Sequence, residues 1–280
     1  MNTKFFDIFM SRVNNYRHDI ELVDVINISI IKGKLSSVES DKCFDDVECE
    51  QHPTLIGLEN CDRSRLQAIR HLKATIYTAF IKKLYEELVI YLNSLLRSAA
   101  IKGKRDGLGT ERIVGDLNIS MSVRQILEAG TWENIAREAA DQIFRNIERE
   151  KSTALLIDKI NKKLALNISD LTVKQALPFL EMRHVLVHAN GIADKKYQKD
   201  YPDIPIDSNG KIQLNYSLIL EARAAVWNLV KNIDKKVVRA GWISSEDLNK
   251  INQSMPSENI VVSVENDHST DPHSNLAETF

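Results

Sequence analysis

The chain has 280 residues, of which 43% are apolar, and its 37 Lys and Arg against 39 Asp and Glu give a formal net charge of −2. This apolar content is sufficient for one large core, or for a domain of ordinary size with a smaller helical partner. The near-neutral balance excludes a global positive field that would attract nucleic acid from a distance, so any polyanion site must be local.

The amino-terminal sequence and the cysteines predict a cytoplasmic protein. The chain opens MNTKFFDIFMSR, which contains neither a long apolar segment nor the cleavage site of a secretory signal. Three cysteines, an odd number, are typical of a reducing compartment. With His52 they could form a metal site, but only Cys49 and His52 have close ligand spacing, so free cysteines are favoured at Cys43, Cys49 and Cys61. Because no stretch approaches the roughly 20 uninterrupted apolar residues of a membrane-spanning helix, we expect no membrane partner.

The first part of the chain predicts a helix followed by a loop. Residues 4–22 carry apolar side chains at helical spacing, and the β-branched run 23–31 fits either the end of this helix or a strand. Residues 34–62 are polar and acidic, which indicates a loop.

A long helix is predicted from Ser64 to Ala100, because this stretch contains neither Gly nor Pro. Its apolar residues recur at helical spacing and predict one buried stripe. The stripe consists of Leu66, Ile69, Leu72, Ile76, Phe80, Leu84, Leu88, Leu92 and Leu95. The basic, glycine-rich segment 102–110 then ends the helix; it lacks the ending of a phosphate-binding loop, so we expect a solvated turn.

Further helices are predicted over residues 122–129, 132–149, 153–165, 171–189 and 214–238. Thr131 is suited to cap the second of these, and Pro178 either kinks the fourth or begins a new helix. Asn190 and Gly191 predict a left-handed end to that helix.

The order of elements predicts an all-α fold, because strand-like alternation is scarce. We expect a helical bundle with long antiparallel helices in residues 63–245. An amino-terminal helical and loop extension (1–62) would precede it, and a short helix with an acidic, disordered tail (246–280) would follow it.

Polar side chains interrupt an apolar run at the end of the predicted helix 171–189. Arg183, His184 and His188 must face a cleft or have partners, because unpaired burial of such groups is costly. On an ideal helix Arg183 and His188 are about 140° apart, whereas His184 and His188 share one face. Histidine is suited to proton transfer near neutral pH, and arginine to phosphate oxygens.

This segment resembles the signature of the HEPN superfamily, an arginine followed by a polar residue and, after a gap of four to six residues, a histidine. The chain also continues past the histidine as similar members do, in particular bacterial RiboL-PSP-HEPN and MAE-type proteins. The matching residues are Asn190, Gly191, Ile192, Asp194, Lys196 and Tyr197. The spacing recurs at Arg12–His18 and Arg65–His71, but an apolar residue follows each of those arginines. The resemblance covers residues 64–240, most closely 181–240.

The resemblance implies an endoribonuclease that uses neither metal nor cofactor. The 2′-hydroxyl of the RNA attacks the adjacent phosphate and leaves a cyclic phosphate. Arg183 and His188 would be the catalytic residues, and the partial negative charge at the helix end suits His188 to the role of general acid. We expect the substrate to be bound by His184, Asn190, Lys195, Lys196 and Tyr197, with the ring of Tyr197 stacking on a base.

The resemblance also implies partners. They are RNA, a second copy of the chain that completes a composite site, and an antitoxin or defence protein in a bacterial toxin–antitoxin or anti-phage system. One position departs from the pattern: similar chains often carry an acidic residue where this chain has Ile81, and Glu86 or Glu87 would have to replace it.

Other interpretations stay open at this point. The chain could be a non-catalytic HEPN-like module that binds RNA, nucleotide or protein, with Arg183 as an anion clamp. Arg183 could form an interior ion pair with His188 as a cap, and His184 could be an ordinary surface residue. The acidic tail from Glu258 onward could cover a basic cleft of the same chain.

Overall fold

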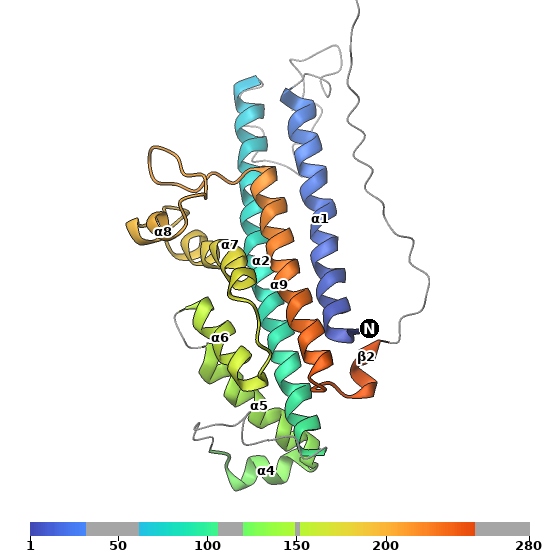
Figure 1. Cartoon of the computed structure of the whole chain (residues 1–280). Coiled ribbons are helices and arrows are strands. Elements are labelled where there is room, and N and C mark those ends of the chain that lie inside the picture. Colours follow the sequence, from blue (N-terminus) through green and yellow to red (C-terminus); the bar gives the residue numbers. More distant parts are fainter. Residues whose placement is uncertain (32–61, 106–119, 149–151, 250–280) are drawn as a thin grey trace, which may run out of the picture. The chain divides into compact units, whose positions relative to one another are not determined.

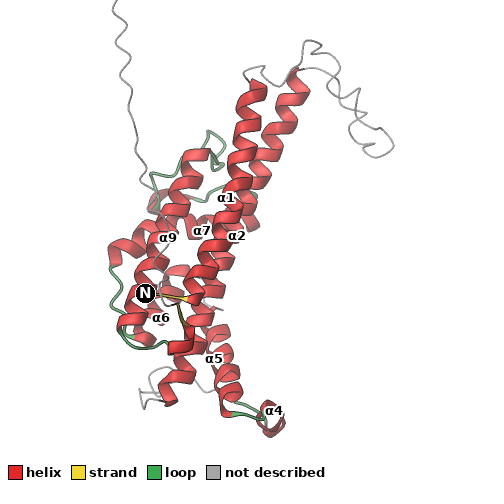
Figure 2. Ribbon diagram, turned by 90° about the vertical axis from the view of Figure 1, so that its right-hand side faces the viewer, coloured by secondary structure: helices red, strands yellow, loops and turns green. Residues whose placement is uncertain are grey.

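The computed structural model describes residues 1–31, 62–105, 120–148 and 152–249, and this part of the chain is almost entirely helical (Figures 1 and 2). The predicted all-α fold is therefore confirmed. None of the described helices is both long enough and apolar enough to cross a membrane. Cys43, Cys49, His52, Cys61 and the predicted disordered tail lie outside the described residues.

Helix α1 (Lys4–Ile31) packs along helix α2 (Asp62–Arg105), and both contact α9 (Tyr216–Arg239). The run 23–31, for which helix and strand were both open, is helical. Buried side chains of α1 join the main hydrophobic core through Phe6, Phe9, Val13 and Ile20. Residues 1–250 form one compact unit, so the segment expected to be an extension supplies part of the core.

Helix α2 lies at the centre of the packing, since it contacts α1, α5, α6, α7 and α9. Most of its predicted stripe is buried, including Phe80, Leu84 and Leu88. Leu72 is an exception: it is 44% exposed, and its predicted burial is wrong. The first turns of α2 and the last turns of α1 extend past the end of α9 (Figures 1 and 2), so fewer helices cover a side chain there.

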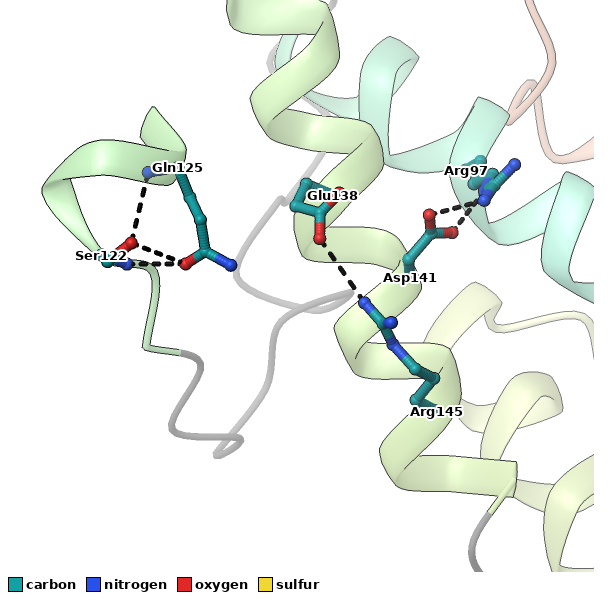
Figure 3. Close-up of polar contacts among 6 residues, drawn as sticks. All are labelled: Arg97, Ser122, Gln125, Glu138, Asp141 and Arg145. Atoms are coloured by element: carbon teal, nitrogen blue, oxygen red, sulfur yellow. Dashed lines mark hydrogen bonds and ion pairs between the residues drawn. The ribbon is translucent and has the colours of Figure 1, made fainter. Parts of the chain in front are cut away.

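Helix α4 (Val123–Ala129) and helix α5 (Trp132–Glu148) begin with side-chain caps. Ser122 and Gln125 form a reciprocal capping box (Figure 3). The Thr131 hydroxyl accepts a hydrogen bond from Asn134 N, as expected for a cap. An ion pair between Arg97 of α2 and Asp141 joins α5 to the core helix (Figure 3).

Helix α7 (Asp170–His188) packs against both α2 and α9, and α6 (Thr153–Leu164) packs against α7. Figure 1 shows α7 and α1 on opposite sides of the pair formed by α2 and α9. Pro178 lies inside α7, which continues through it to His188. The short helix α8 (Lys195–Asp200) follows.

Polar contacts attach the amino terminus to the helices. Strand β1 (Asn2–Thr3) pairs antiparallel with β2 (Leu248–Asn249), which follows the 3-10 turn η3 (Ser245–Asp247). The buried carboxylate of Asp234 on α9 accepts hydrogen bonds from Thr3 N (3.1 Å), the Thr3 hydroxyl (2.5 Å) and the Tyr91 hydroxyl of α2 (3.2 Å). One acidic side chain therefore joins β1, α2 and α9.

Candidate functional site

The last two turns of α7 present the predicted motif. Met182 and Val185 face the core and are buried, which turns the intervening positions outward. Arg183 is half-buried, whereas His184 and His188 are exposed. The amphipathic spacing of the helix end therefore separates the motif from the core residues around it.

A left-handed turn ends α7 directly after His188. The carbonyl of Val185 accepts hydrogen bonds from both Ala189 N and Gly191 N, each at 3.0 Å. Asn190 has φ +52° and Gly191 has φ +84°, so the predicted left-handed helix end is confirmed. Asn190 is exposed and forms part of this turn. Asparagine tolerates this conformation better than most residues, and glycine adopts it without steric cost.

Backbone contacts hold the loop after α7 in place. Ala193 N donates to Gly210 O and Ile212 N donates to Gly191 O, both at 2.9 Å. The opposing segment is a turn in which the Asp207 carboxylate accepts from Asn209 N and Lys211 N. The segment that follows His188 is therefore hydrogen-bonded to a second turn, which the Asp207 side chain stabilises.

Helix α8 begins with a cap and has one buried aromatic residue. The Asp194 carboxylate accepts from Tyr197 N at 2.7 Å, and Lys195 and Lys196 are exposed. Tyr197 is only 7% exposed, and its hydroxyl donates to Pro178 O of α7 at 2.8 Å. Burial, then the neighbouring Tyr201 and Glu181, raise its pKa. The expected role of Tyr197 as an accessible stacking ring is therefore wrong; this side chain fixes α8 to α7.

The structure brings two of the three motif side chains together. The imidazole rings of His184 and His188 have centroids 4.8 Å apart and are tilted by 47°. The guanidinium carbon of Arg183 lies 5.0 Å from the centre of the Tyr85 ring on α2, in a cation–π contact. The residues described here include no carboxylate in an ion pair with Arg183. The i, i+4 spacing predicted the pairing of the histidines, and the wide angle predicted the separate direction of Arg183.

His184 lines a pocket of about 430 Å³ between the start of α6, one face of α7, and α8. Glu181 contributes to the same wall, and its carboxylate accepts from Thr153 N at 3.0 Å, which caps α6 from a neighbouring helix. The further lining residues are Ser152, Ala154, Val185, Ala189, Ile192, Asp194, Lys196, Tyr197, Asp200 and Tyr201. Arg183, His188 and Lys195 are not part of this lining among the described residues.

Sequence reasoning did not assign Glu181, Asp200 or Tyr201, which line the pocket, to the site. Tyr201 follows Tyr197 by four residues, and the two rings make an edge-to-face contact with centroids 4.9 Å apart. This i, i+4 spacing was a signal available in the sequence. The roles of Glu181 and Asp200 depend on the placement of α6 and α8, which no local pattern indicates.

The structure also bears on the other arginine motifs and on the departure at Ile81. Arg12 forms an ion pair with the buried Glu87 at 3.0 Å, and Lys83 pairs with Glu86 at 2.8 Å. Ile81 is 1% exposed and belongs to the hydrophobic core. Both glutamates named as replacements for the acidic residue are therefore engaged by other cations.

Neither the basic segment after α2 nor a cluster of metal-ligating side chains adds a ligand site within the described residues. In the segment 102–110, only Lys102 has a described side chain, and it donates to Ile243 O at 2.8 Å. Within the described ranges, no group of three or more His, Cys, Asp or Glu side chains has an arrangement that could hold a metal ion.

Comparisons with protein-family models, with curated proteins and with solved structures find no match to this chain. The resemblance to the HEPN superfamily therefore rests on the motif residues and on the sequence that follows them.

Proposed function

We propose that this chain is a HEPN-like endoribonuclease that cleaves single-stranded or loop RNA without a metal ion. The observation that carries the proposal is the contact between His184 and His188 at the end of α7, with His184 on the wall of a pocket. Cleavage of an RNA phosphodiester needs one group to accept a proton and another to donate one. Two adjacent imidazoles can supply both.

In the proposed reaction, His184 accepts the proton of the 2′-hydroxyl, whose oxygen attacks the adjacent phosphorus. His188 donates a proton to the departing 5′-oxygen as the bond between phosphorus and that oxygen breaks. The products are a 2′,3′-cyclic phosphate and a free 5′-hydroxyl. The exposed Lys195 and Lys196 contact the backbone on either side.

Arg183 stabilises the negative charge on the phosphate oxygens in this proposal. Its cation–π contact with Tyr85 of α2, and not with the histidine pair, supports a site in which the arginine of one copy meets the histidines of a second. The proposed protein is therefore a homodimer. The resemblance places it in the bacterial cytoplasm, in a toxin–antitoxin or anti-phage system with a neutralising or activating partner protein.

A second candidate function is a non-catalytic module that binds RNA, a nucleotide or a protein. The observation in its favour is the apolar Ile81 together with the engagement of Glu86 and Glu87 by other cations. In that case the pocket and the lysines of α8 bind a ligand, and no bond is broken.

An RNA cleavage assay in EDTA separates the two functions. The full chain is incubated with a mixed-sequence single-stranded RNA, and the product ends are identified by mass spectrometry. The nuclease yields 2′,3′-cyclic phosphate ends at a rate that added magnesium does not raise. Binding of the RNA without cleavage, with or without magnesium, identifies the module instead.

A further inference from the structure

The pocket beside His184 has a lining that is unsuited to phosphate. Three carboxylates, from Glu181, Asp194 and Asp200, line it together with Lys196 and His184. This excess of negative charge repels a phosphate group. Its volume of about 430 Å³ is within the usual range of roughly 300 to 1,000 Å³ for small-molecule pockets.

The same pocket has a fixed aromatic wall. The ring of Tyr201 packs edge to face on Tyr197, with centroids 4.9 Å apart. The Tyr197 hydroxyl donates a hydrogen bond to Pro178 O, so the ring that supports Tyr201 is fixed to α7. Tyr201 is half-buried, whereas Tyr197 is nearly covered. Tyr201 is therefore the ring on which a planar ligand can stack.

Glu181 and Asp200 line the pocket together with Tyr201. Burial, and then the negative charges of Glu181 and Asp200, raise the pKa of Tyr201. The hydroxyl therefore stays protonated at neutral pH and remains a donor. The pocket thus offers carboxylate acceptors and one phenol donor beside a stacking surface.

We propose that this pocket binds the base next to the scissile phosphate and selects guanine. Guanine carries two adjacent N–H donor groups and one carbonyl acceptor on its Watson–Crick edge. Carboxylates accept from such N–H groups, and the Tyr201 hydroxyl donates to the carbonyl. Uracil offers two carbonyl oxygens and one N–H, so it meets the carboxylates with the wrong polarity. The phosphate stays outside the pocket, next to the histidine pair.

This inference rests on the proposed nuclease function, but its test does not require cleavage. Guanosine, adenosine, cytidine and uridine are titrated in turn into the full chain by isothermal titration calorimetry. We expect guanosine to bind about tenfold or more tightly than uridine, because the carboxylates accept hydrogen bonds from the guanine N–H groups but face carbonyl oxygens in uracil.

Matched variants locate the binding to the pocket. Asp200→Asn should weaken guanosine binding about tenfold, since it replaces an acceptor oxygen by an amide. Tyr201→Phe, which keeps the ring, should weaken it by a smaller factor. Asp203→Asn, at an exposed position two residues beyond Tyr201, should leave it unchanged. Far-ultraviolet circular dichroism verifies that each variant is folded.

Equal affinity for all four nucleosides, a preference for any base other than guanine, or no binding at all overturns the inference. So does unchanged guanosine affinity in both Asp200→Asn and Tyr201→Phe. If the chain cleaves RNA in EDTA but does not prefer guanosine, the proposed nuclease function stands and the proposed guanine pocket is rejected. If the chain prefers guanosine but cleaves no RNA, the guanine pocket stands and the proposed nuclease function is rejected.

Discussion

Arg183 and His188 occupy different surroundings although they belong to one short motif. The arginine makes a cation–π contact with Tyr85 of α2, and the histidine lies against His184 at the end of α7. A planar guanidinium can stack on a ring and bind a phosphate through two parallel hydrogen bonds, whereas an ammonium group provides only a compact charge. The identity of the cation at position 183 therefore matters as much as its charge.

Arg183→Lys should lower the rate of RNA cleavage about tenfold or more, because a lysine cannot make the forked phosphate contact of a guanidinium. Initial rates at saturating and limiting RNA measure the change. Arg124→Lys, at an exposed position on α4, is the matched control and should cleave like the wild type. If Arg183→Lys also retains the full rate, position 183 needs only a positive charge.

Among the elements, α9 is joined to β1 and α2 by a buried carboxylate. Thr3 and Tyr91 donate hydrogen bonds to Asp234, yet burial raises the pKa of Asp234 above its usual value in spite of these bonds. A carboxyl group with a raised pKa in the folded state favours folding most in its protonated form. Its contribution to the free energy of unfolding is therefore lost as the pH rises from the ordinary carboxyl pKa through the raised value.

Asp234→Asn removes this titration. The variant should be less stable than the wild type by about 1 to 3 kcal/mol, since an acceptor of buried hydrogen bonds is lost. The difference in unfolding free energy between the two proteins should be larger near pH 4 than at pH 7. Urea unfolding followed by circular dichroism at several pH values measures it, and a difference that grows with pH would show that the raised pKa is wrong.

Local sequence signals predicted the elements well where one segment determines its own conformation. The absence of Gly and Pro predicted most of α2, and Asn190 with Gly191 predicted the left-handed end of α7. Contacts between distant segments could not be read in this way. The contact of Arg183 with Tyr85 and the placement of the pocket carboxylates depend on how the helices pack, which local periodicity does not specify. Leu72 has the spacing of a core residue but is exposed, although Ile69, one turn earlier on α2, is buried.

At the scale of the whole molecule, the proposed composite site needs two copies of the chain. Separately purified Arg183→Ala and His188→Ala proteins should each be inactive. A mixture of the two should regain cleavage, because a mixed dimer has one site that combines the intact arginine of one copy with the intact histidine of the other. Random exchange predicts about a quarter of the wild-type rate. A mixture that stays inactive, although mass spectrometry shows that mixed dimers form, would place the whole site within one chain.

The most direct test of the account compares variants of two histidines that each follow an arginine after a gap of four to six residues. His188→Ala and His71→Ala each remove the histidine that follows an arginine at HEPN-like spacing, and both residues are exposed. RNA cleavage in EDTA is measured for both, with circular dichroism to verify the helical fold. The account predicts that His188→Ala abolishes cleavage and that His71→Ala cleaves like the wild type. A folded His188→Ala protein that still cleaves RNA at the wild-type rate would contradict it.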